Sequence, residues 1–246
     1  MRKEPISVHV DTPVDEVIQT IEKYNLVAVP VVDSIGRLVG RITVDDVMDE
    51  VREQAERDYQ LASGLSQDVE TDDSVLRQTS ARLPWLLIGM LGGIGNSMIL
   101  GNFDTTFAAH PEMALYIPLI GGTGGNVGTQ SSALVVQGLA NSSLDANNTW
   151  KQILKESVVA LINATIISML VYIYNFVRFG PTATVSYSVS LSLFAVVMFA
   201  SIFGTLVPMT LEKLKIDPAI ATGPFISITN DIIGMMLYMG ITVLLS

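Results

Sequence analysis

The chain has 246 residues, of which 49% are hydrophobic, a mean hydropathy of +0.46 and a formal net charge of −10. This composition is too apolar for an ordinary soluble globular protein, so it favours a membrane protein. The absence of cysteine excludes disulfide scaffolds, thiolate metal sites and cysteine nucleophiles.

The charge is concentrated in the N-terminal part of the chain. Residues 1–73 carry 17 of the 24 acidic residues and 7 of the 14 basic ones, and the rest of the chain carries seven of each. No basic stripe is present to neutralise phosphates, so nucleic acid is not an expected partner. The N-terminus lacks the apolar core of a signal peptide, and we expect this acidic head to stay in the cytoplasm.

The head shows alternating strand and helix patterns. Short β-branched runs at residues 6–10 and 26–32 predict strands, and apolar residues at helical spacing predict a helix over 13–25. A turn at 33–37 leads to another strand and then to an acidic helix from Asp45. The predicted order is strand, helix, strand, strand, helix.

Seven acidic residues lie on this last helix against two basic ones. Like charges four residues apart destabilise an isolated helix by a few tenths of a kcal/mol per pair. The run is therefore either a solvated face or a surface that binds divalent cations, which would relieve the repulsion. The acids are Asp45, Asp46, Asp49, Glu50, Glu53, Glu56 and Asp58, and the bases are Arg52 and Arg57.

Five apolar segments follow. Each is long enough to cross a bilayer core of roughly 30 Å as a helix, which predicts an α-helical polytopic membrane protein with five transmembrane helices. The segments cover residues 83–101, 113–140, 153–176, 187–211 and 219–245.

Basic residues predict the orientation of these helices. They precede the first segment and lie in the loops after the second and the fourth, whereas the alternate loops contribute only Arg178. By the positive-inside rule, we expect a multi-pass protein of the cell (inner) membrane with a cytoplasmic N-terminus and an external C-terminus. The basic residues are Arg77, Arg82, Lys151, Lys155, Lys213 and Lys215.

Asp231 is the one ionisable residue near the centre of an apolar segment, whereas Glu156 and Glu212 are expected at helix ends near water. A carboxylate at mid-bilayer costs about 2.5–3.5 kcal/mol, so it should face a cavity or a counter-ion. Ser227 and Gly223, four and eight residues earlier, are expected on the same side of the helix. A water-filled path is the favoured interpretation, and a protonated Asp bonded to a neighbouring helix is the structural alternative.

The segment "PLIGGTGGNVGTQSS", residues 118–132, is rich in glycine and polar residues. Glycines let helices pack closely, and consecutive glycines also favour local unwinding that aims carbonyl oxygens into a cavity. We favour a pore-lining element in which packing is part of the same function. The candidate pore-lining residues are Gly124, Gly125, Asn126, Thr129 and Gln130.

The available ligands are a carboxylate with amide, hydroxyl and carbonyl oxygens. This set suits Mg²⁺, Ca²⁺ or Mn²⁺ better than Zn²⁺ or Cu²⁺. Mg²⁺ dehydrates reluctantly, so a site with few carboxylates could hold it largely hydrated. Two chains that met at a pore would bring two Asp231 carboxylates to one ion.

Four motifs together resemble the C-terminal two-thirds of an MgtE-type magnesium channel. They are "VPVVDSIGRLVGRITVDDVMDEV", which is similar to the second of two CBS motifs, "RLPWLL", "GGTGGNVGTQS" and "DPAIATGPFISITNDIIG". The resemblance implies a homodimer with its pore at the dimer axis, lined by the second and fifth helices. It also implies that Asp231 holds hydrated Mg²⁺ and that Gly223 and Ser227 line the pore.

The resemblance divides the chain into three parts. Residues 1–47 correspond to a partial CBS domain, 48–80 to a connecting or plug helix with a linker, and 81–246 to the pore domain. Relatives carry a further N-terminal helical domain and a first CBS motif, so Met1 is expected to mark a truncated start or a short member of the family.

The resemblance also implies regulation by the head. The plug helix closes the pore when intracellular Mg²⁺ is high, and Asp46, Asp49 and Asp58 match acidic positions that sense the ion. Thr43 and Asp46 match nucleotide-binding positions, so ATP is a further expected ligand.

The predicted function is therefore a channel that moves Mg²⁺ into the cytoplasm. Neither histidine lies in a membrane segment and no nucleophile–base pair is apparent, so an enzyme is not expected. Two alternatives stay open: an ion-coupled divalent-cation carrier, and a non-transporting membrane protein that senses metal or nucleotide. The choice among Mg²⁺, Mn²⁺ and Ca²⁺ also stays open.

Overall fold

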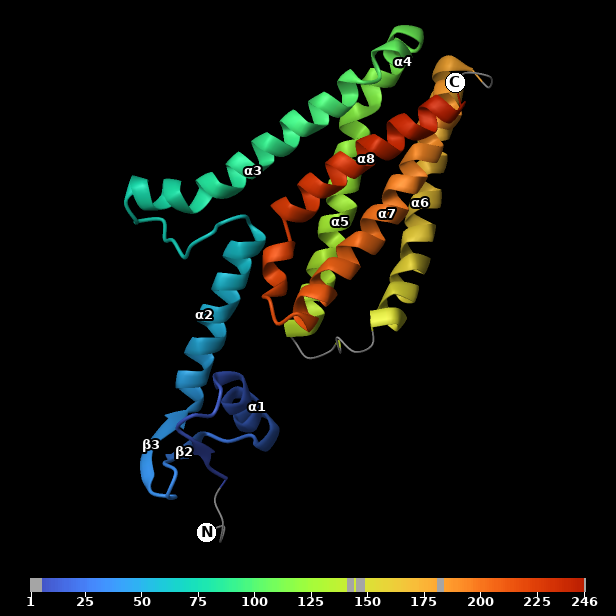
Figure 1. The fold of residues 1–246 in the computed structure, drawn as a ribbon. Helices are drawn as coiled ribbons and strands as arrows, with labels where there is room; N and C mark the ends of the chain where they lie inside the picture. The colour runs from blue at the N-terminus through green and yellow to red at the C-terminus, as the bar shows by residue number, and fades with distance from the viewer. Residues whose placement is uncertain (1–5, 141–143, 145–148, 181–183, 246) are drawn as a thin grey trace. The chain divides into compact units, whose positions relative to one another are not determined.

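A computed structural model describes residues 6–140, 144, 149–180 and 184–245, so Met1 lies outside the described residues. The chain folds into two compact units, Met1–Asp58 and Tyr59–Ser246. Figure 1 traces the elements of each unit, and each unit is considered by itself.

The first unit contains a three-stranded sheet in the order β1-β2-β3. β1 (Val8–His9) pairs in parallel with β2 (Ala28–Val32), and β2 pairs antiparallel with β3 (Leu38–Thr43). A parallel pair needs a crossover connection, which here contains α1 (Val14–Tyr24). The strands and helices follow in the order predicted from the sequence. The buried apolar side chains of this unit are Val8, Val17, Ile21, Val29 and Val47.

α2 (Val44–Ala62) begins at a reciprocal hydrogen-bonded cap. The Thr43 amide and hydroxyl donate to Oδ2 of Asp46 at 2.8 and 2.6 Å, and the Asp46 amide donates to the Thr43 hydroxyl at 3.4 Å. This is the capping-box arrangement, which satisfies amides that the helix leaves unpaired. The bonds from the Thr43 side chain and amide lower the pKa of Asp46, because they favour its charged form.

Both arginines of α2 pair with acids of the same helix. Arg57 contacts Glu50 at 3.2 Å and Glu53 at 2.7 Å, and Arg52 contacts Glu56 at 3.1 Å. Pairs this exposed contribute little to stability, about 0–1 kcal/mol each.

The second unit is helical. Within the described residues, four of its helices are long and apolar enough to cross a membrane, namely α3, α6, α7 and α8. α5 has 24 residues, two more than α8, but its glycines and polar residues lower its mean hydropathy. The elements are α3 (Val75–Gly101), α4 (Asp104–Ala109), η1 (Pro111–Tyr116), α5 (Ile117–Ala140), α6 (Thr149–Phe179), α7 (Thr184–Lys213), η3 (Pro218–Ala221) and α8 (Pro224–Leu245).

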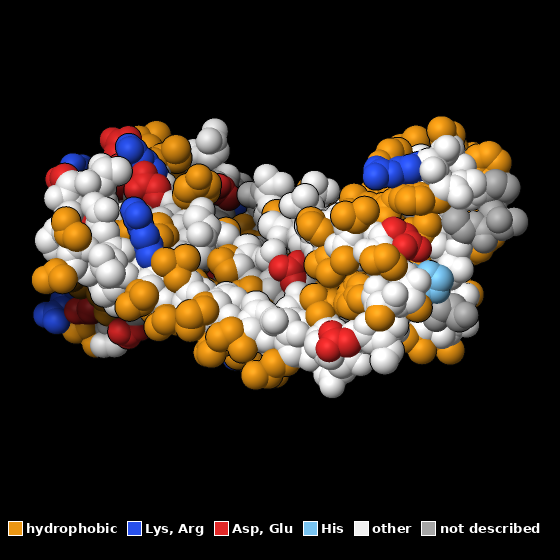
Figure 2. All heavy atoms as spheres, turned by 90° about the horizontal axis from the view of Figure 1, so that it is seen from above, with side chains coloured by type: hydrophobic (Ala, Val, Ile, Leu, Met, Phe, Trp, Pro, Cys, Tyr) orange, Lys and Arg blue, Asp and Glu red, His pale blue; other side chains and the backbone are white. Residues whose placement is uncertain are grey.

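α7 lies at the centre of this unit, in contact with α5, α6 and α8, whereas α3 packs along α8 (Figure 1). In the most apolar 18-residue stretch of α7, 56% of the residues are buried, whereas none are buried in the corresponding stretch of α3. Figure 2 shows hydrophobic side chains spread over much of one face. Exposed leucines and isoleucines on α3 and α6 suit contact with lipid rather than water.

A buried carboxyl group joins three helices of the second unit. Glu156 of α6 is only 8% exposed, and its Oε1 accepts hydrogen bonds from Ser131 of α5 at 2.7 Å and Ser201 of α7 at 2.5 Å. The two hydroxyl oxygens lie 3.0 Å apart. The expectation that Glu156 sits near water is therefore wrong, because α5 and α7 cover it.

We expect this cluster to stabilise the packing of α5, α6 and α7. Glu156→Gln keeps an acceptor for both hydroxyls and should change stability by less than about 1 kcal/mol. Glu156→Leu removes that acceptor; the two hydroxyls, 3.0 Å apart, can still bond to each other, so one donor is left unsatisfied at about 1–3 kcal/mol. Thermal unfolding of the purified protein in detergent measures the difference, with exposed Glu212→Leu as control. Equal melting temperatures for the Gln and Leu variants of Glu156 would contradict the assignment.

Candidate cation site

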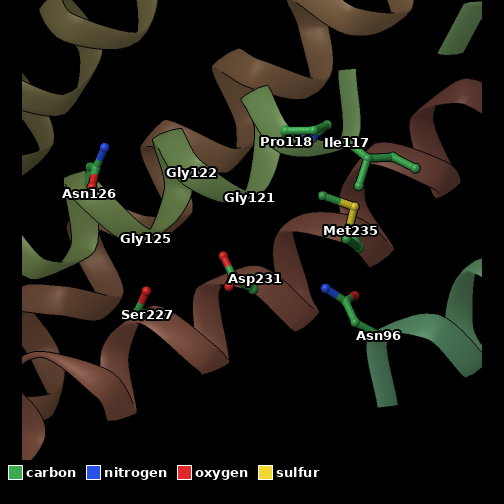
Figure 3. A pocket seen from close by; sticks show the side chains of 10 residues that line it. All are labelled: Asn96, Ile117, Pro118, Gly121, Gly122, Gly125, Asn126, Ser227, Asp231 and Met235. Carbon is green, nitrogen blue, oxygen red and sulfur yellow. The ribbon is translucent and has the colours of Figure 1, made fainter. Parts of the chain in front are cut away.

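A pocket of about 300 Å³ lies between α3, α5 and α8 (Figure 3). It contains one carboxylate, that of Asp231, together with the Ser227 hydroxyl and the amides of Asn96 and Asn126. Its other walls are glycine backbone and apolar side chains. The lining residues are Asn96, Ile117, Pro118, Gly121, Gly122, Gly125, Asn126, Ser227, Asp231 and Met235.

α8 positions the carboxylate and the hydroxyl. Ser227 and Asp231 are four residues apart, so they lie on one face of the helix. The helix begins at Pro224, and Gly223 before it has a φ of +55°, so the expectation of a helical segment that starts at residue 219 and includes Gly223 is wrong. Proline is preorganised for the first helical position, and glycine adopts the left-handed conformation without a steric penalty.

Asn230, the neighbour of Asp231, anchors α8 against α5. Its side chain is 1% exposed, and its Nδ2 donates a hydrogen bond to the backbone oxygen of Gly124 at 3.3 Å. Successive residues of a helix point about 100° apart. With Asn230 held against α5, Asp231 is turned into the pocket.

The glycines of α5 have two separate roles. A Cβ at Gly121 would lie 3.3 Å from Asp231 Oδ1, and one at Gly125 would lie 2.8 Å from the Ser227 hydroxyl, so these two glycines keep the pocket open. A Cβ at Gly124 would lie 2.9 Å from Val196 of α7. A Cβ at Gly128 would overlap Nδ2 of Asn230. Gly124 and Gly128 therefore allow α5 to pack closely against its neighbouring helices.

α5 is a continuous helix from Ile117 to Ala140. The expected local unwinding at consecutive glycines is therefore wrong. In a bilayer, backbone groups without an internal partner are costly, and an unbroken helix satisfies them along its length. The polar atoms that reach the pocket from α5 therefore come mainly from side chains such as Asn126.

The structure brings four of the candidate pore residues together at the pocket: Gly125, Asn126, Ser227 and Asp231. Gly124 packs behind it against α7 and α8. Thr129, partly buried, and Gln130, exposed, are outside its lining, as is Gly223.

The sequence does not single out Asn96 as a site residue, and it presents Gly121 and Gly122 only as part of the glycine-rich segment. The available signal for Asn96 was an amide four residues after Gly92 in an apolar segment. That spacing puts the amide and the small residue on one helix face.

The site can hold a cation only with help from water or another chain. No hydrogen bond or ion pair reaches Asp231 from the described part of the chain, and that part contains no cluster of three or more His, Cys, Asp or Glu residues placed to hold a metal. Six waters at about 30 Å³ each occupy roughly 180 Å³. The pocket is thus large enough for a divalent ion with an octahedral water shell, the state that Mg²⁺ prefers.

The last residue of α2 and the residues that follow it contact the start of α8. The carbonyl oxygen of Ala62 occupies the position that a Cβ on Gly223 would take, and a Cβ on Gly64 would lie 2.6 Å from the Pro224 ring. Substituents at either glycine would push the two segments apart. The end of α2 is therefore in direct contact with the helix that carries Asp231.

The candidate sensing residues are spread along α2. Asp46 caps the helix, Asp49 is exposed, and Asp58 is partly buried. At 1.5 Å per residue, Asp46 and Asp58 are separated by about 18 Å along the axis. The three residues of one chain therefore do not form a single ion site.

Comparison with known families gives two matches. The family described as MgtE, divalent cation transporter, matches residues 117–241, which contain α5, α6, α7 and most of α8 with Asp231. The CBS domain family matches residues 1–53.

Three relatives share the name magnesium transporter MgtE. The protein from Bacillus subtilis (strain 168) is 34% identical over 227 residues, which cover 92% of this chain and 50% of the relative. Those from Enterococcus faecalis and Thermus thermophilus are each 33% identical, over 96% and 100% of this chain and 52% and 54% of their own lengths. The chain spans about half the length of the curated relatives it matches.

Proposed function

Because the chain belongs to the MgtE family of divalent cation transporters, we propose that it forms a channel that admits Mg²⁺ to the cytoplasm. The observation that carries the proposal is the Asp231 carboxylate, without a bonded partner in the described residues and facing a pocket of about 300 Å³. An inside-negative potential of 100 mV favours entry of a divalent ion by about 4.6 kcal/mol. No coupled ion is needed to drive such entry.

α5 is proposed as a fifth membrane crossing beside α3, α6, α7 and α8. Its 24 residues span about 36 Å, enough for a bilayer core of roughly 30 Å. A helix that lines an aqueous path has less need of hydropathy than one that faces lipid. We propose that this five-helix protein lies in the cell (inner) membrane with the N-terminus cytoplasmic and the C-terminus outside. Residues 1–47 would form a partial CBS domain, residues 48–80 the connecting or plug helix with its linker, and residues 81–246 the pore domain.

A homodimer is proposed as the functional unit. One carboxylate is sparse for a divalent ion, and a second copy would supply a second Asp231. α5 and α8 would then line the pore at the dimer axis. The pore-lining roles of Gly124, Thr129, Gln130 and Gly223 remain predictions for this dimer.

We propose that α2 regulates the pore. Mg²⁺ bound to its acidic surface would relieve repulsion and hold the helix end against Gly223 and Pro224, where it closes the path. This contact supports the proposal because it joins the acidic helix to α8 in the same chain. ATP binding at Thr43 and Asp46 stays a prediction, since in the structure these side chains bond to each other.

The gating role predicts a shifted Mg²⁺ response when α2 loses charge. In the triple variant Asp46→Asn, Asp49→Asn, Asp58→Asn, closure should need several-fold more intracellular Mg²⁺, and Asn at position 46 keeps an acceptor for the Thr43 cap. Open probability in membrane patches measures this, with exposed Asp15→Asn as control. An unchanged Mg²⁺ dependence would show that these acids form only a solvated surface.

Uptake in cells that lack their own Mg²⁺ transport tests the proposed function against its alternatives. A channel gives Mg²⁺ uptake that follows membrane potential. Flux that follows an imposed pH or Na⁺ gradient would instead indicate a carrier, and no flux would favour a non-transporting sensor.

A further inference from the structure

Asn96 of α3 lies at the wall of the pocket away from α5, with its amide nitrogen turned towards Asp231 and its amide oxygen on the far side (Figure 3). We propose that Asn96 is a cation-site residue, whose amide oxygen accepts hydrogen bonds from the waters around the ion held at Asp231. The inference rests on the proposed function and adds a third helix to a site expected only from α5 and α8.

A close helix contact places Asn96 there. A Cβ at Gly92 would overlap Cγ2 of Ile228, and one at Gly89 would lie 3.7 Å from Cδ1 of the same residue. Asn96 is one helical turn beyond Gly92, and Asp231 is three residues beyond Ile228. α3 and α8 run in the same direction, so the Gly92 contact carries the amide to the level of the carboxylate (Figure 1).

Among the described residues, no protein group bonds to the amide oxygen of Asn96. Its Oδ1 is buried without a hydrogen bond in the part of the chain that the structure describes, and most buried polar groups have such a partner. Since no donor holds Oδ1 in place, rotation about the soft χ2 torsion can present it to the pocket. Water molecules bound to a cation direct their hydrogens outwards, so a hydrated ion supplies the missing donors.

This role has a consequence for ion preference. Mg²⁺ keeps an octahedral water shell and dehydrates reluctantly, whereas Ca²⁺ takes six to eight oxygen ligands directly. A neutral acceptor that binds shell waters therefore favours the ion that keeps them. Asn96 should contribute to a preference for Mg²⁺ over Ca²⁺.

The test uses the full chain in proteoliposomes, with Mg²⁺ and Ca²⁺ uptake measured against ion concentration. Asn96→Leu removes one hydrogen bond to the shell and should raise the KM for Mg²⁺ about 3- to 10-fold, with a smaller effect on Ca²⁺. Asn96→Asp keeps an acceptor and should retain or lower that KM. The exposed neighbour variant Ser97→Ala should match the wild type.

Two results would overturn the inference and leave the proposed function in place. One is a wild-type KM and ion preference in Asn96→Leu. The other is equal loss of flux in the Leu and Asp variants with lowered melting temperatures, which would make Asn96 a packing residue. Absence of flux in the wild-type chain would instead reject the proposed function, and this inference with it.

Discussion

Asp231→Asn is expected to reduce Mg²⁺ uptake at least about tenfold. The substitution keeps the size and polarity of the side chain but removes the one carboxylate that lines the pocket. A hydrogen bond to a charged group contributes about 1.5–3 kcal/mol, and each 1.4 kcal/mol is a factor of ten in binding. In a dimer the loss applies to both carboxylates that face the ion. Uptake in cells that lack Mg²⁺ transport provides the measurement.

Asp231→Ala should be at least as severe, since it also removes the polar group. Asp104→Asn is the matched control, because Asp104 is an exposed acid of α4 outside the pocket. If both Asp231 variants transport at the wild-type rate, the ion does not depend on this carboxylate and the proposed site is wrong.

Gly204→Ala is expected to destabilise the membrane unit and abolish most of the flux. A Cβ at Gly204 of α7 would overlap the backbone oxygen of Gly128 of α5, and backbone cannot move aside as a flexible side chain can. Overpacking of this kind costs about 1–3 kcal/mol. Gly128 also packs against Asn230, so a displaced α5 would disturb the residue that orients Asp231. Thermal unfolding and Mg²⁺ uptake measure the two effects.

Gly240→Ala is the control for helix propensity. Nothing lies within 4 Å of a Cβ at Gly240, and alanine is favoured over glycine in a helix interior by roughly 0.5–1 kcal/mol. This variant should be as stable as the wild type or more so. A Gly204→Ala protein that unfolds at the same temperature as Gly240→Ala would show that the α5–α7 contact can relax.

The local features of the chain could be predicted because they depend on neighbours in sequence. The strand and helix order of the head follows from hydrophobic periodicity, and the pairing of Ser227 with Asp231 on one face follows from their four-residue spacing. The start of this helix was predicted too early, because the apolar pattern begins at residue 219 whereas the helix begins at Pro224.

Features that depend on packing could not be predicted. Gly124 and Gly125 cannot be distinguished in the sequence, but Gly124 packs against Val196 of α7 whereas Gly125 faces Ser227 in the pocket. This difference depends on the positions of α7 and α8 around α5. The sequence shows only that Glu156 lies near the start of an apolar segment, which predicts exposure to water. It does not show that Ser131 and Ser201 cover the carboxyl group. Asn96 belongs to the site only because Gly92 lets α3 approach Ile228.

The most direct test of the central claim is Mg²⁺ flux into proteoliposomes that contain only the purified chain. We predict uptake that saturates with Mg²⁺, rises with an inside-negative potential, needs no pH or Na⁺ gradient, and falls at least about tenfold in Asp231→Asn. Flux no greater than in empty vesicles, or flux that Asp231→Asn leaves unchanged, would contradict the claim that this chain forms a magnesium pathway through the Asp231 site.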